Sequence, residues 1–338
     1  MEFFLKAIFI SFFGLCLSYV FVKSYLSFAK KYNLLSGQND LNVPNKIVPT
    51  SAGLALACAF FVTLYPINFL YPIQVSYLLS ILMGASFMTV MGFLDDLKNI
   101  SAFIKILFQF IFSLGILYIF GADSIYVGLN EVSLVFLGIF FIIFLIWIIN
   151  TFNFIDGADG LLASNCSLIC CLLFFFFFSS NNEFLSLIAI SLGSISMGFL
   201  RFNWTPASAF MGDSGSLFFG SMFVVLICGS IFQEILSIWT WLIILSIFYV
   251  ETTVTLIIRL IRKENFFSGR HELHAYQKLV IKTQDHSSPS KAFIAIQSLW
   301  TIPASLLSFY FPEYNPLIYF ITILPMIIGF YHFGPRKS

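Results

Sequence analysis

Charged residues are scarce in this chain of 338 residues, and their scarcity argues against a soluble globular protein. Asp, Glu, Lys and Arg make up 10% of the sequence, whereas a soluble domain contains about 25%. The hydrophobic fraction is 59%, and Phe alone contributes 45 residues. The net charge of +1 offers no basic surplus for nucleic acid. We therefore expect an integral membrane protein with no nucleic-acid partner.

The cysteine patterns of a zinc site or a disulfide framework are missing as well. All six cysteines lie within apolar runs, and no spacing among them is typical of a zinc site. We expect them to pack as small apolar side chains and to form no disulfides. They are Cys16, Cys58, Cys166, Cys170, Cys171 and Cys228.

Long apolar runs are what the sequence has instead. A transmembrane helix needs about 20 predominantly apolar residues, and the chain offers a series of such runs along its whole length. We interpret it as an all-α polytopic membrane protein with about eleven transmembrane helices, in which residues 1–338 form one membrane-embedded domain. The expected spans are 3–22, 51–70, 77–94, 102–120, 132–150, 161–179, 184–200, 212–232, 236–258, 292–311 and 316–333.

The basic residues predict the orientation of these spans, because cytoplasmic loops are enriched in Lys and Arg. Every second connection, together with the C-terminal tail, contains or adjoins all Lys and Arg residues except Lys6. We therefore expect an external N-terminus and a cytoplasmic C-terminus. The cytoplasmic connections, which we expect to carry the catalytic residues, are 23–50, 95–101, 151–160, 201–211 and 259–291.

Five aspartates interrupt the apolar pattern. They are Asp95, Asp96, Asp156, Asp159 and Asp213, and the predicted topology places all of them at the cytoplasmic face. A charged side chain at the centre of a bilayer costs roughly 2.5–3.5 kcal/mol on insertion scales, so five acids beside hydrocarbon need a reason. A divalent cation would relieve their mutual repulsion.

Mg²⁺ suits such a site because it binds one or two carboxylates and keeps phosphate oxygens as further ligands. We predict a Mg²⁺ site that acts on a phosphate ester, with Mn²⁺ as a substitute. Two roles without a metal stay open for these acids. Asp213 could be an ordinary helix N-cap, and Asp95 with Asp96 could be a solvated loop pair.

A basic segment follows the ninth span. It contains Arg259, Arg262 and Lys263, which flanking of the membrane would also explain. His271 and His274 follow, without the further ligands that a zinc site requires. Contact with phosphate or diphosphate is the interpretation we favour, because cations and imidazoles neutralise charge that develops during phosphoryl transfer.

Taken together and in this order, the motifs resemble the polyprenyl-phosphate N-acetylhexosamine-1-phosphate transferase superfamily (glycosyltransferase family 4). The resemblance runs from residue 44 to residue 277 and is greatest to the WecA-like branch, which is related to the phospho-N-acetylmuramoyl-pentapeptide translocase. One motif departs from the family pattern: before the second span an Arg is absent, and Ala52 replaces a Gly, so Lys46 is the remaining cation. The matching segments are 92–96 with Lys105 and Gln109, Asn150 with 153–161, 202–207, 210–216 and 271–277.

The resemblance implies a reaction in which a membrane polyprenyl phosphate, such as undecaprenyl phosphate, attacks the β-phosphate of a UDP-N-acetylhexosamine. The products are the polyprenyl-diphosphate-sugar and UMP, in the initiating step of O-antigen or other cell-envelope glycan synthesis at the bacterial inner membrane. By the resemblance, Asp213 is the leading metal ligand, with Asp95 and Asp96 as further ligands. The catalytic set it implies is Asp95, Asp96, Asp156, Asp159 and His274. The substrate-binding residues that we predict are Lys46, Lys105, Asn150, Asn153, Asn203, Arg270 and His271, with Glu251 added for its position within the ninth span.

Glu251 is an acid within the ninth span, roughly 12 Å from its cytoplasmic end. Intramembrane acids face the bundle interior or a cavity, so we expect it either to form a polar wall of the lipid-phosphate groove or to hydrogen bond to a neighbouring helix. A transporter or flippase is the competing function, although such proteins place their acids near the midplane on broken helices. An inactive homologue is a third interpretation. Three questions stay open. They are the identity of the sugar, the choice between direct attack and an aspartyl-phosphate intermediate, and the choice between a monomer and a homodimer.

Overall fold

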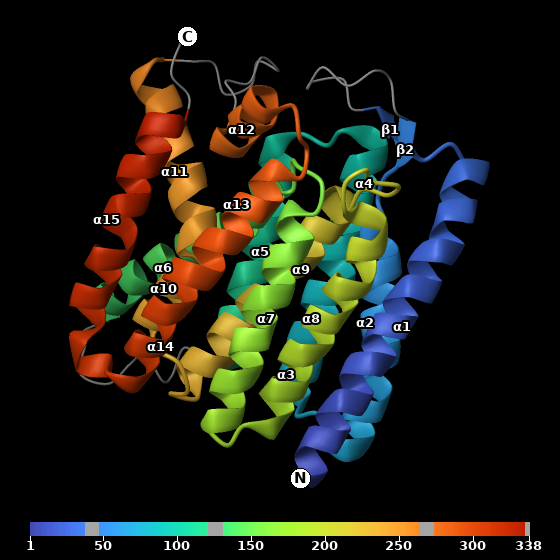
Figure 1. The fold of residues 1–338 in the computed structure, drawn as a ribbon. Helices are drawn as coiled ribbons and strands as arrows, with labels where there is room; N and C mark the ends of the chain where they lie inside the picture. Colours follow the sequence, from blue (N-terminus) through green and yellow to red (C-terminus); the bar gives the residue numbers. More distant parts are fainter. Residues whose placement is uncertain (38–46, 121–130, 264–273, 335–338) are drawn as a thin grey trace.

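A computed structural model of the chain describes residues 1–37, 47–120, 131–263 and 274–334. Almost all of them are helical (Figure 1). A two-stranded antiparallel sheet pairs β1 (Leu35–Gly37) with β2 (Ile47–Pro49). The helices are α1 (Glu2–Lys31), α2 (Gly53–Leu70), α3 (Val75–Leu82), α4 (Thr89–Lys98), α5 (Ala102–Phe120), α6 (Glu131–Ile155), α7 (Leu161–Ser179), α8 (Glu183–Asn203), α9 (Gly212–Phe232), α10 (Ile238–Ile244), α11 (Ser246–Ile261), α12 (Ala275–Thr283), α13 (Ser288–Ile296), α14 (Ile302–Tyr310) and α15 (Asn315–Phe333), with short π- or 3₁₀-helical pieces at η1 (Met83–Met88), η3 (Gln297–Thr301) and η4 (Pro312–Tyr314).

The predicted fold class is confirmed. Within the described ranges, ten helical stretches are long and apolar enough to cross a membrane, and an eleventh is added if one bent pair counts as a span. Continuous stretches can include more than one element: α3, η1 and α4 form one span, and α13, η3 and α14 form another. The orientation of the termini stays a prediction.

The ninth predicted span, 236–258, is not one straight helix. The chain breaks at Leu245, and α10 and α11 meet at an angle of 74°. This stretch contains neither Gly nor Pro, the usual causes of a sharp kink. Its continuous hydrophobicity therefore predicts a single span and gives no sign of the break. The first helix also differs, because it continues beyond the predicted end at residue 22 to Lys31.

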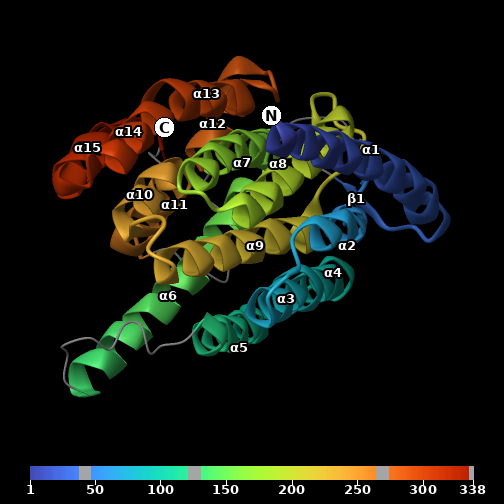
Figure 2. The ribbon, with the colours of Figure 1, turned by 90° about the horizontal axis from the view of Figure 1, so that it is seen from below.

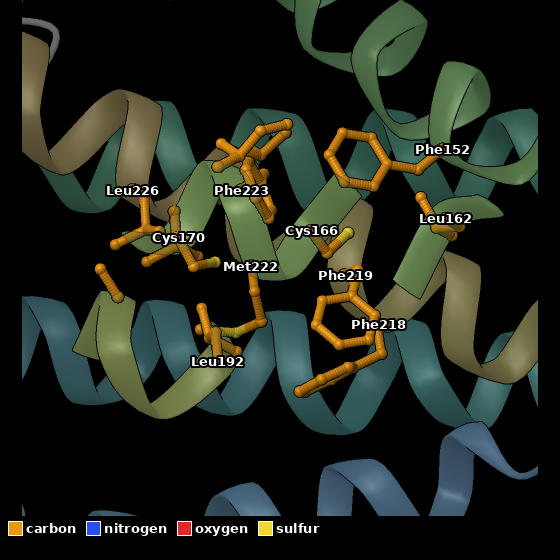
Figure 3. Packing of buried hydrophobic residues seen from close by; sticks show 14 of the residues in the cluster. Phe152, Leu162, Cys166, Cys170, Leu192, Phe218, Phe219, Met222, Phe223 and Leu226 are labelled. Atoms are coloured by element: carbon orange, nitrogen blue, oxygen red, sulfur yellow. The ribbon is translucent and has the colours of Figure 1, made fainter. Parts of the chain in front are cut away.

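Helix α9 lies at the centre of the bundle. In the view from below it runs between α7 and α8 on one side and α2 to α5 on the other (Figure 2). Of the residues in its apolar membrane-spanning stretch, 89% are buried inside the protein. Its aromatic side chains pack against α6, α7 and α8 (Figure 3). Labelled members of this core include Phe152, Cys166, Leu192, Phe219 and Phe223. All six cysteines are free thiols; Cys166, Cys170 and Cys228 are buried in the core, whereas Cys58 and Cys171 are exposed.

Small residues let neighbouring helices approach closely, which matters in a bilayer because lipid tails are as apolar as the core. A Cβ added at Gly198 of α8 would lie 2.6 Å from the Leu15 carbonyl oxygen of α1. Polar bonds reinforce these contacts. The Ser18 hydroxyl of α1 donates to the Ile195 carbonyl of α8 at 2.7 Å.

Two approaches of this kind bring α4 and α2 against the first turn of α9. A Cβ at Gly92 would lie 2.3 Å from the Asp213 carbonyl oxygen, and a Cβ at Gly53 of α2 would lie 2.0 Å from the Gly215 nitrogen. Both distances are far inside van der Waals contact, so only glycine fits. Because Gly92 precedes Asp95 by about one helical turn, the contact sets the position of the α4 acids relative to Asp213.

We expect Gly92→Ala to lower the melting temperature of the detergent-solubilised protein, because the added methyl group forces α4 away from α9. Overpacking of this kind costs about 1–3 kcal/mol. The control is Gly138→Ala in α6, where an added Cβ meets nothing within 4 Å. Equal melting temperatures for the two variants, measured by intrinsic fluorescence, would contradict the close contact.

Candidate active site

A polar cavity of about 300 Å³ lies where the first turn of α9 meets the end of α4 and the turn between α6 and α7. It gathers five of the predicted site residues from segments far apart in the chain, namely Asp96, Asn153, Asp156, Asn203 and Asp213. The full lining is Thr50, Asp96, Asn153, Asp156, Gly157, Ala158, Asn203, Phe210, Met211, Gly212 and Asp213.

Asp96 is held by the backbone of α9. Its Oδ1 accepts the Asp213 N–H at 2.8 Å, and its Oδ2 accepts the Ser214 N–H at 3.2 Å. The first N–H groups of a helix have no partner within the helix, and a carboxylate there also interacts favourably with the helix dipole. Gly212 has a positive φ of 71°, and a Cβ on it would lie 2.6 Å from Asp96 Oδ2. The Asp96 carboxylate therefore caps α9 from another helix.

Asp95, Lys105 and Asp213 form a second group of charges. The Lys105 ammonium lies 2.5 Å from Asp95 Oδ2 and 3.4 Å from Asp213 Oδ2, and Asp95 Oδ1 also accepts the Ile100 N–H at 2.7 Å. The Asp95 side chain is 7% exposed and that of Asp213 is 29% exposed. Met211 occupies the N-cap position of α9, so Asp213 lies within the first turn. Asp213 therefore presents a carboxylate to the cavity, with a cation and a second carboxylate beside it.

Asp156 and Asn153 reach the cavity from the end of α6 and the turn that follows. The Asn153 amide donates to the Ser216 hydroxyl at 3.0 Å, which joins the end of α6 to α9. Burial raises the pKa of the partly buried Asp156 carboxyl well above its usual range, and the nearby Asp213 and Asp96 carboxylates add to the rise. A cation in the cavity would stabilise the ionised form of Asp156.

Asp159 and Asn203 connect the loops around the cavity. Asp159 Oδ2 accepts bonds from the Thr205 hydroxyl and the Ala207 N–H, both at 3.1 Å. The Asn203 side chain accepts the Gly160 N–H and donates to the Ala209 carbonyl, both at 3.0 Å. These bonds fix the α6–α7 turn against the loop that precedes α9. Asp159 and Asn203 are both buried. Asn203 is among the residues that line the cavity.

Asn150 contacts a neighbouring helix. Its amide donates to Gln109 Oε1 at 2.7 Å, and the Gln109 amide lies 3.4 Å from Asn150 Oδ1. This reciprocal pair joins α5 to α6 about one helical turn before Asn153. The contact of Asn150 with substrate stays a prediction.

His274 precedes α12 as its N-cap and is oriented by Glu251 of α11. The His274 Nδ1 lies 3.0 Å from Glu251 Oε2, and Glu251 Oε1 accepts the Ala275 N–H at 2.9 Å. A carboxylate accepts hydrogen bonds, so in the tautomer with its proton on Nδ1 the His274 ring donates to Glu251. Glu251 is fully buried. The hydrogen bond to a neighbouring helix is therefore present, and a place for Glu251 in the wall of the lipid-phosphate groove stays a prediction.

Tyr276 is a residue whose role the sequence reasoning missed, although it lies in the segment 271–277 that carries part of the resemblance. Its hydroxyl donates to the Phe154 carbonyl at 2.8 Å, and a Cβ on Gly157 would lie 2.1 Å from that hydroxyl. Tyr276 thereby fixes α12 against the cavity wall. The predicted residues Lys46, Arg270 and His271 lie outside the described residues.

The segment that departs from the family pattern packs against the loop before α9. The Ala52 N–H donates to the Phe210 carbonyl at 3.2 Å, and the Gly53 N–H donates to the Met211 carbonyl at 3.0 Å. Thr50, which sequence reasoning did not select, lines the cavity. Ala52 is fully buried, so its methyl group fits at this position.

The residues that line the cavity fit a Mg²⁺ ion bound together with a phosphate. No cluster of three or more His, Cys, Asp or Glu side chains with metal-binding geometry occurs within residues 1–37, 47–120, 131–263 and 274–334. A Mg²⁺ ion needs only one or two protein carboxylates when phosphate oxygens supply further ligands. Asp213 and Asp156 line the same cavity and are the carboxylates that would hold such an ion.

Comparison with known proteins gives consistent matches. The model of glycosyl transferase family 4 matches residues 78–231, a range that includes all five aspartates. A probable undecaprenyl-phosphate N-acetylglucosaminyl 1-phosphate transferase of Bacillus subtilis (strain 168) is 27% identical over 314 residues, covering 89% of this chain and 84% of the relative. A phospho-N-acetylmuramoyl-pentapeptide-transferase of Prochlorococcus marinus (strain MIT 9312) is 29% identical over 278 residues, covering 73% of this chain and 74% of the relative.

The raised pKa of Asp156 predicts a pH-dependent stability. A carboxyl group whose pKa is higher in the folded state than in the unfolded state stabilises the fold when the pH is below the pKa of the unfolded state, about 3.9. This contribution is lost as the pH rises through the pKa of the folded state. We expect Asp156→Asn to melt at a higher temperature than the unsubstituted protein at pH 7 in EDTA, and at an equal temperature near pH 4.

The matched control is Asp285→Asn. Hydrogen bonds from Ser287, together with Lys291, lower the pKa of this exposed carboxyl to about 2, so its removal has the opposite sign and does not raise the melting temperature at pH 7. A melting temperature of Asp156→Asn that is unchanged at both pH values would contradict the raised pKa.

Proposed function

Because the chain belongs to glycosyl transferase family 4, we propose that it transfers an N-acetylhexosamine 1-phosphate from a UDP-sugar to a polyprenyl phosphate such as undecaprenyl phosphate. The products are the polyprenyl-diphosphate-sugar and UMP. The reaction takes place at the cytoplasmic face of the bacterial inner membrane and begins the synthesis of O-antigen or another cell-envelope glycan.

The observation that carries the proposal is the cavity itself. It combines three carboxylates, Asp96, Asp156 and Asp213, with amide groups from Asn153 and Asn203, at the ends of membrane-spanning helices. A lipid phosphate can reach such a position while its polyprenyl chain remains in the bilayer, and a water-soluble nucleotide can reach it from the aqueous side. A transporter would instead need its acids along a path through the bundle.

In the proposed reaction, an oxygen of the lipid phosphate forms a bond to the β-phosphorus of the UDP-sugar. The bond between the β-phosphorus and the oxygen that bridges it to the α-phosphorus breaks, and UMP leaves with that oxygen. A phosphate monoester has a second pKa near 6, so the attacking oxygen is already largely ionised at neutral pH. The main tasks of the protein are therefore alignment and charge neutralisation.

The described residues divide these tasks by position. Lys105 lies against Asp95 and Asp213, where it balances their charge and stabilises negative charge on the transferred phosphoryl group. Asp95 is the group nearest to this ammonium and can take up the remaining proton of a lipid phosphate. Asn153 and Asn203 orient donor oxygens within the cavity.

Asp213 and Asp156 would hold Mg²⁺, or Mn²⁺ in its place, against the donor diphosphate. When bound, the ion supplies charge neutralisation for the phosphate oxygens. Asp96, whose two oxygens already accept N–H groups of α9, acts in this proposal by fixing the position of Asp213. His274 directs Nε2 toward a phosphate oxygen while Glu251 holds Nδ1.

The test is an assay for UMP with purified protein, undecaprenyl phosphate, Mg²⁺ and a panel of UDP-N-acetylhexosamines. We expect UMP release with at least one donor. Asp213→Asn is expected to lower kcat by about 100-fold or more, comparable to the loss of one strong electrostatic contact in a transition state. Asp285→Asn, which alters an exposed acid outside the cavity, is the control with unchanged turnover.

Three results would overturn the proposal. Release of no UMP with any donor would favour the inactive homologue. Lipid or solute movement across proteoliposomes without UMP release would favour a transporter. Full turnover of Asp213→Asn would remove Asp213 from the reaction, even if the transferase activity itself were found.

The Glu251–His274 pair gives a second prediction. Outer partners that orient a functional imidazole typically contribute about 10–100-fold to metal-site activity, so we expect Glu251→Gln to lower kcat about 10-fold. Thr252→Val is the control, because the Thr252 hydroxyl donates to the Phe248 carbonyl of its own helix at 3.0 Å.

A double-mutant cycle separates orientation from general damage to the fold. If Glu251 acts through the imidazole, Glu251→Gln has little further effect in a His274→Gln background. Additive losses of kcat in the double variant would show that the two side chains act independently.

A further inference from the structure

A second cavity lies outside the active site, between α12, α13, η3 and α15. It measures about 540 Å³, within the range of about 300–1,000 Å³ that is typical of small-molecule sites. Its walls are almost entirely apolar. They include Phe293, Ile296 and Trp300 on one side and Met326 and Phe330 on the other.

Among the described residues, the charged groups that line this cavity are two lysines. Lys278 and Lys282 come from α12, the short helix that follows His274. The Lys278 ammonium donates to the Gly334 carbonyl at 2.8 Å, just beyond the last turn of α15. The cavity therefore has a positive end near the C-terminus of α15 and an apolar interior that extends along α13 and η3.

The position of α12 determines where this positive end lies along the length of the helix bundle. Tyr276, one of the lining residues, bonds to the Phe154 carbonyl beside the active-site cavity, so the two cavities lie close to each other. In Figure 1, α12 lies at the same end of the bundle as β1 and β2. Lysines at this depth lie where phospholipid headgroups meet the ends of transmembrane helices.

From these observations we infer that the cavity is a binding site for an anionic phospholipid. One acyl chain lies in the apolar cavity, and the headgroup phosphate contacts Lys278 and Lys282. Basic pockets between transmembrane helices are the kind of site that selects anionic headgroups. The apolar walls select only for a hydrocarbon chain, so the preference for charge comes from the two lysines.

A bound lipid would also support the active site. Helix α12 has nine residues, which is too short for independent stability in water, and His274 is its N-cap. A hydrocarbon chain packed against Tyr276 and Leu279 adds contacts on the face of α12 that lines the cavity. The lipid therefore stabilises the helix that positions His274.

The experiment uses the full chain in nanodiscs that contain phosphatidylcholine with phosphatidylglycerol at one lipid in five. Lipids that remain bound after detergent transfer are counted by native mass spectrometry. We expect about one phosphatidylglycerol to be retained per chain, and a higher melting temperature than in phosphatidylcholine alone.

Gly329→Leu adds a side chain to the wall of the cavity, because Gly329 lines it, and the backbone accommodates the new Cβ, which meets nothing within 4 Å. We expect it to abolish retention. The control is Gly138→Leu, which adds the same side chain at an equally open position in α6 and leaves retention unchanged. Lys278→Gln combined with Lys282→Gln is expected to remove the preference for phosphatidylglycerol over phosphatidylcholine.

Each other outcome overturns the inference. Equal retention of both phospholipids by the unsubstituted protein would leave no selection for charge. Full retention by Gly329→Leu would place the lipid elsewhere. A retained polyprenyl phosphate that Gly329→Leu displaces would make this the acceptor site, and a Gly329-dependent dimer would make it an interface between two copies.

Discussion

The whole site depends on the capping of α9 by Asp96. The N–H groups at the start of a helix need partners, and here two of them receive a carboxylate from α4. The contact is possible because Gly92 and Gly212 leave room where any larger residue would clash. These hydrogen bonds, together with the two glycines that have no side chain, set the distance between the helices that carry Asp95 and Asp213.

The other polar contacts extend this arrangement outward. Lys105 joins α5 to Asp95 and Asp213, and a reciprocal amide pair joins α5 to α6. Asp159 and Asn203 then fasten the loops around the cavity. Because most of these groups are shielded from water, an unmade bond would cost about 1–3 kcal/mol, so the site has little freedom to rearrange.

Hydrophobic length was enough to predict most of the helices, and three of the five aspartates that the motifs selected, Asp96, Asp156 and Asp213, line one cavity. Hydrophobic length depends on local composition, which is why the predicted spans agree with α2, α5, α7 and α9 to within a few residues. The bend at Leu245 depends on packing, and no residue type marks it. The same limit applies within the site. Asp96 and Asp213 are both aspartates beside apolar runs and both line the cavity, and only the three-dimensional contacts show that Asp96 also caps a helix.

The burial of α9 has a consequence for the membrane around the protein. Helices that touch lipid tilt or shift when the bilayer becomes thinner or thicker, a response known as hydrophobic mismatch. In the apolar stretch of α1 only 28% of the residues are buried inside the protein, and in the span that contains α15 only 22% are. The corresponding share for α9 is 89%. The outer helices therefore absorb a change in bilayer thickness, while the helix that carries Asp213 is insulated from it.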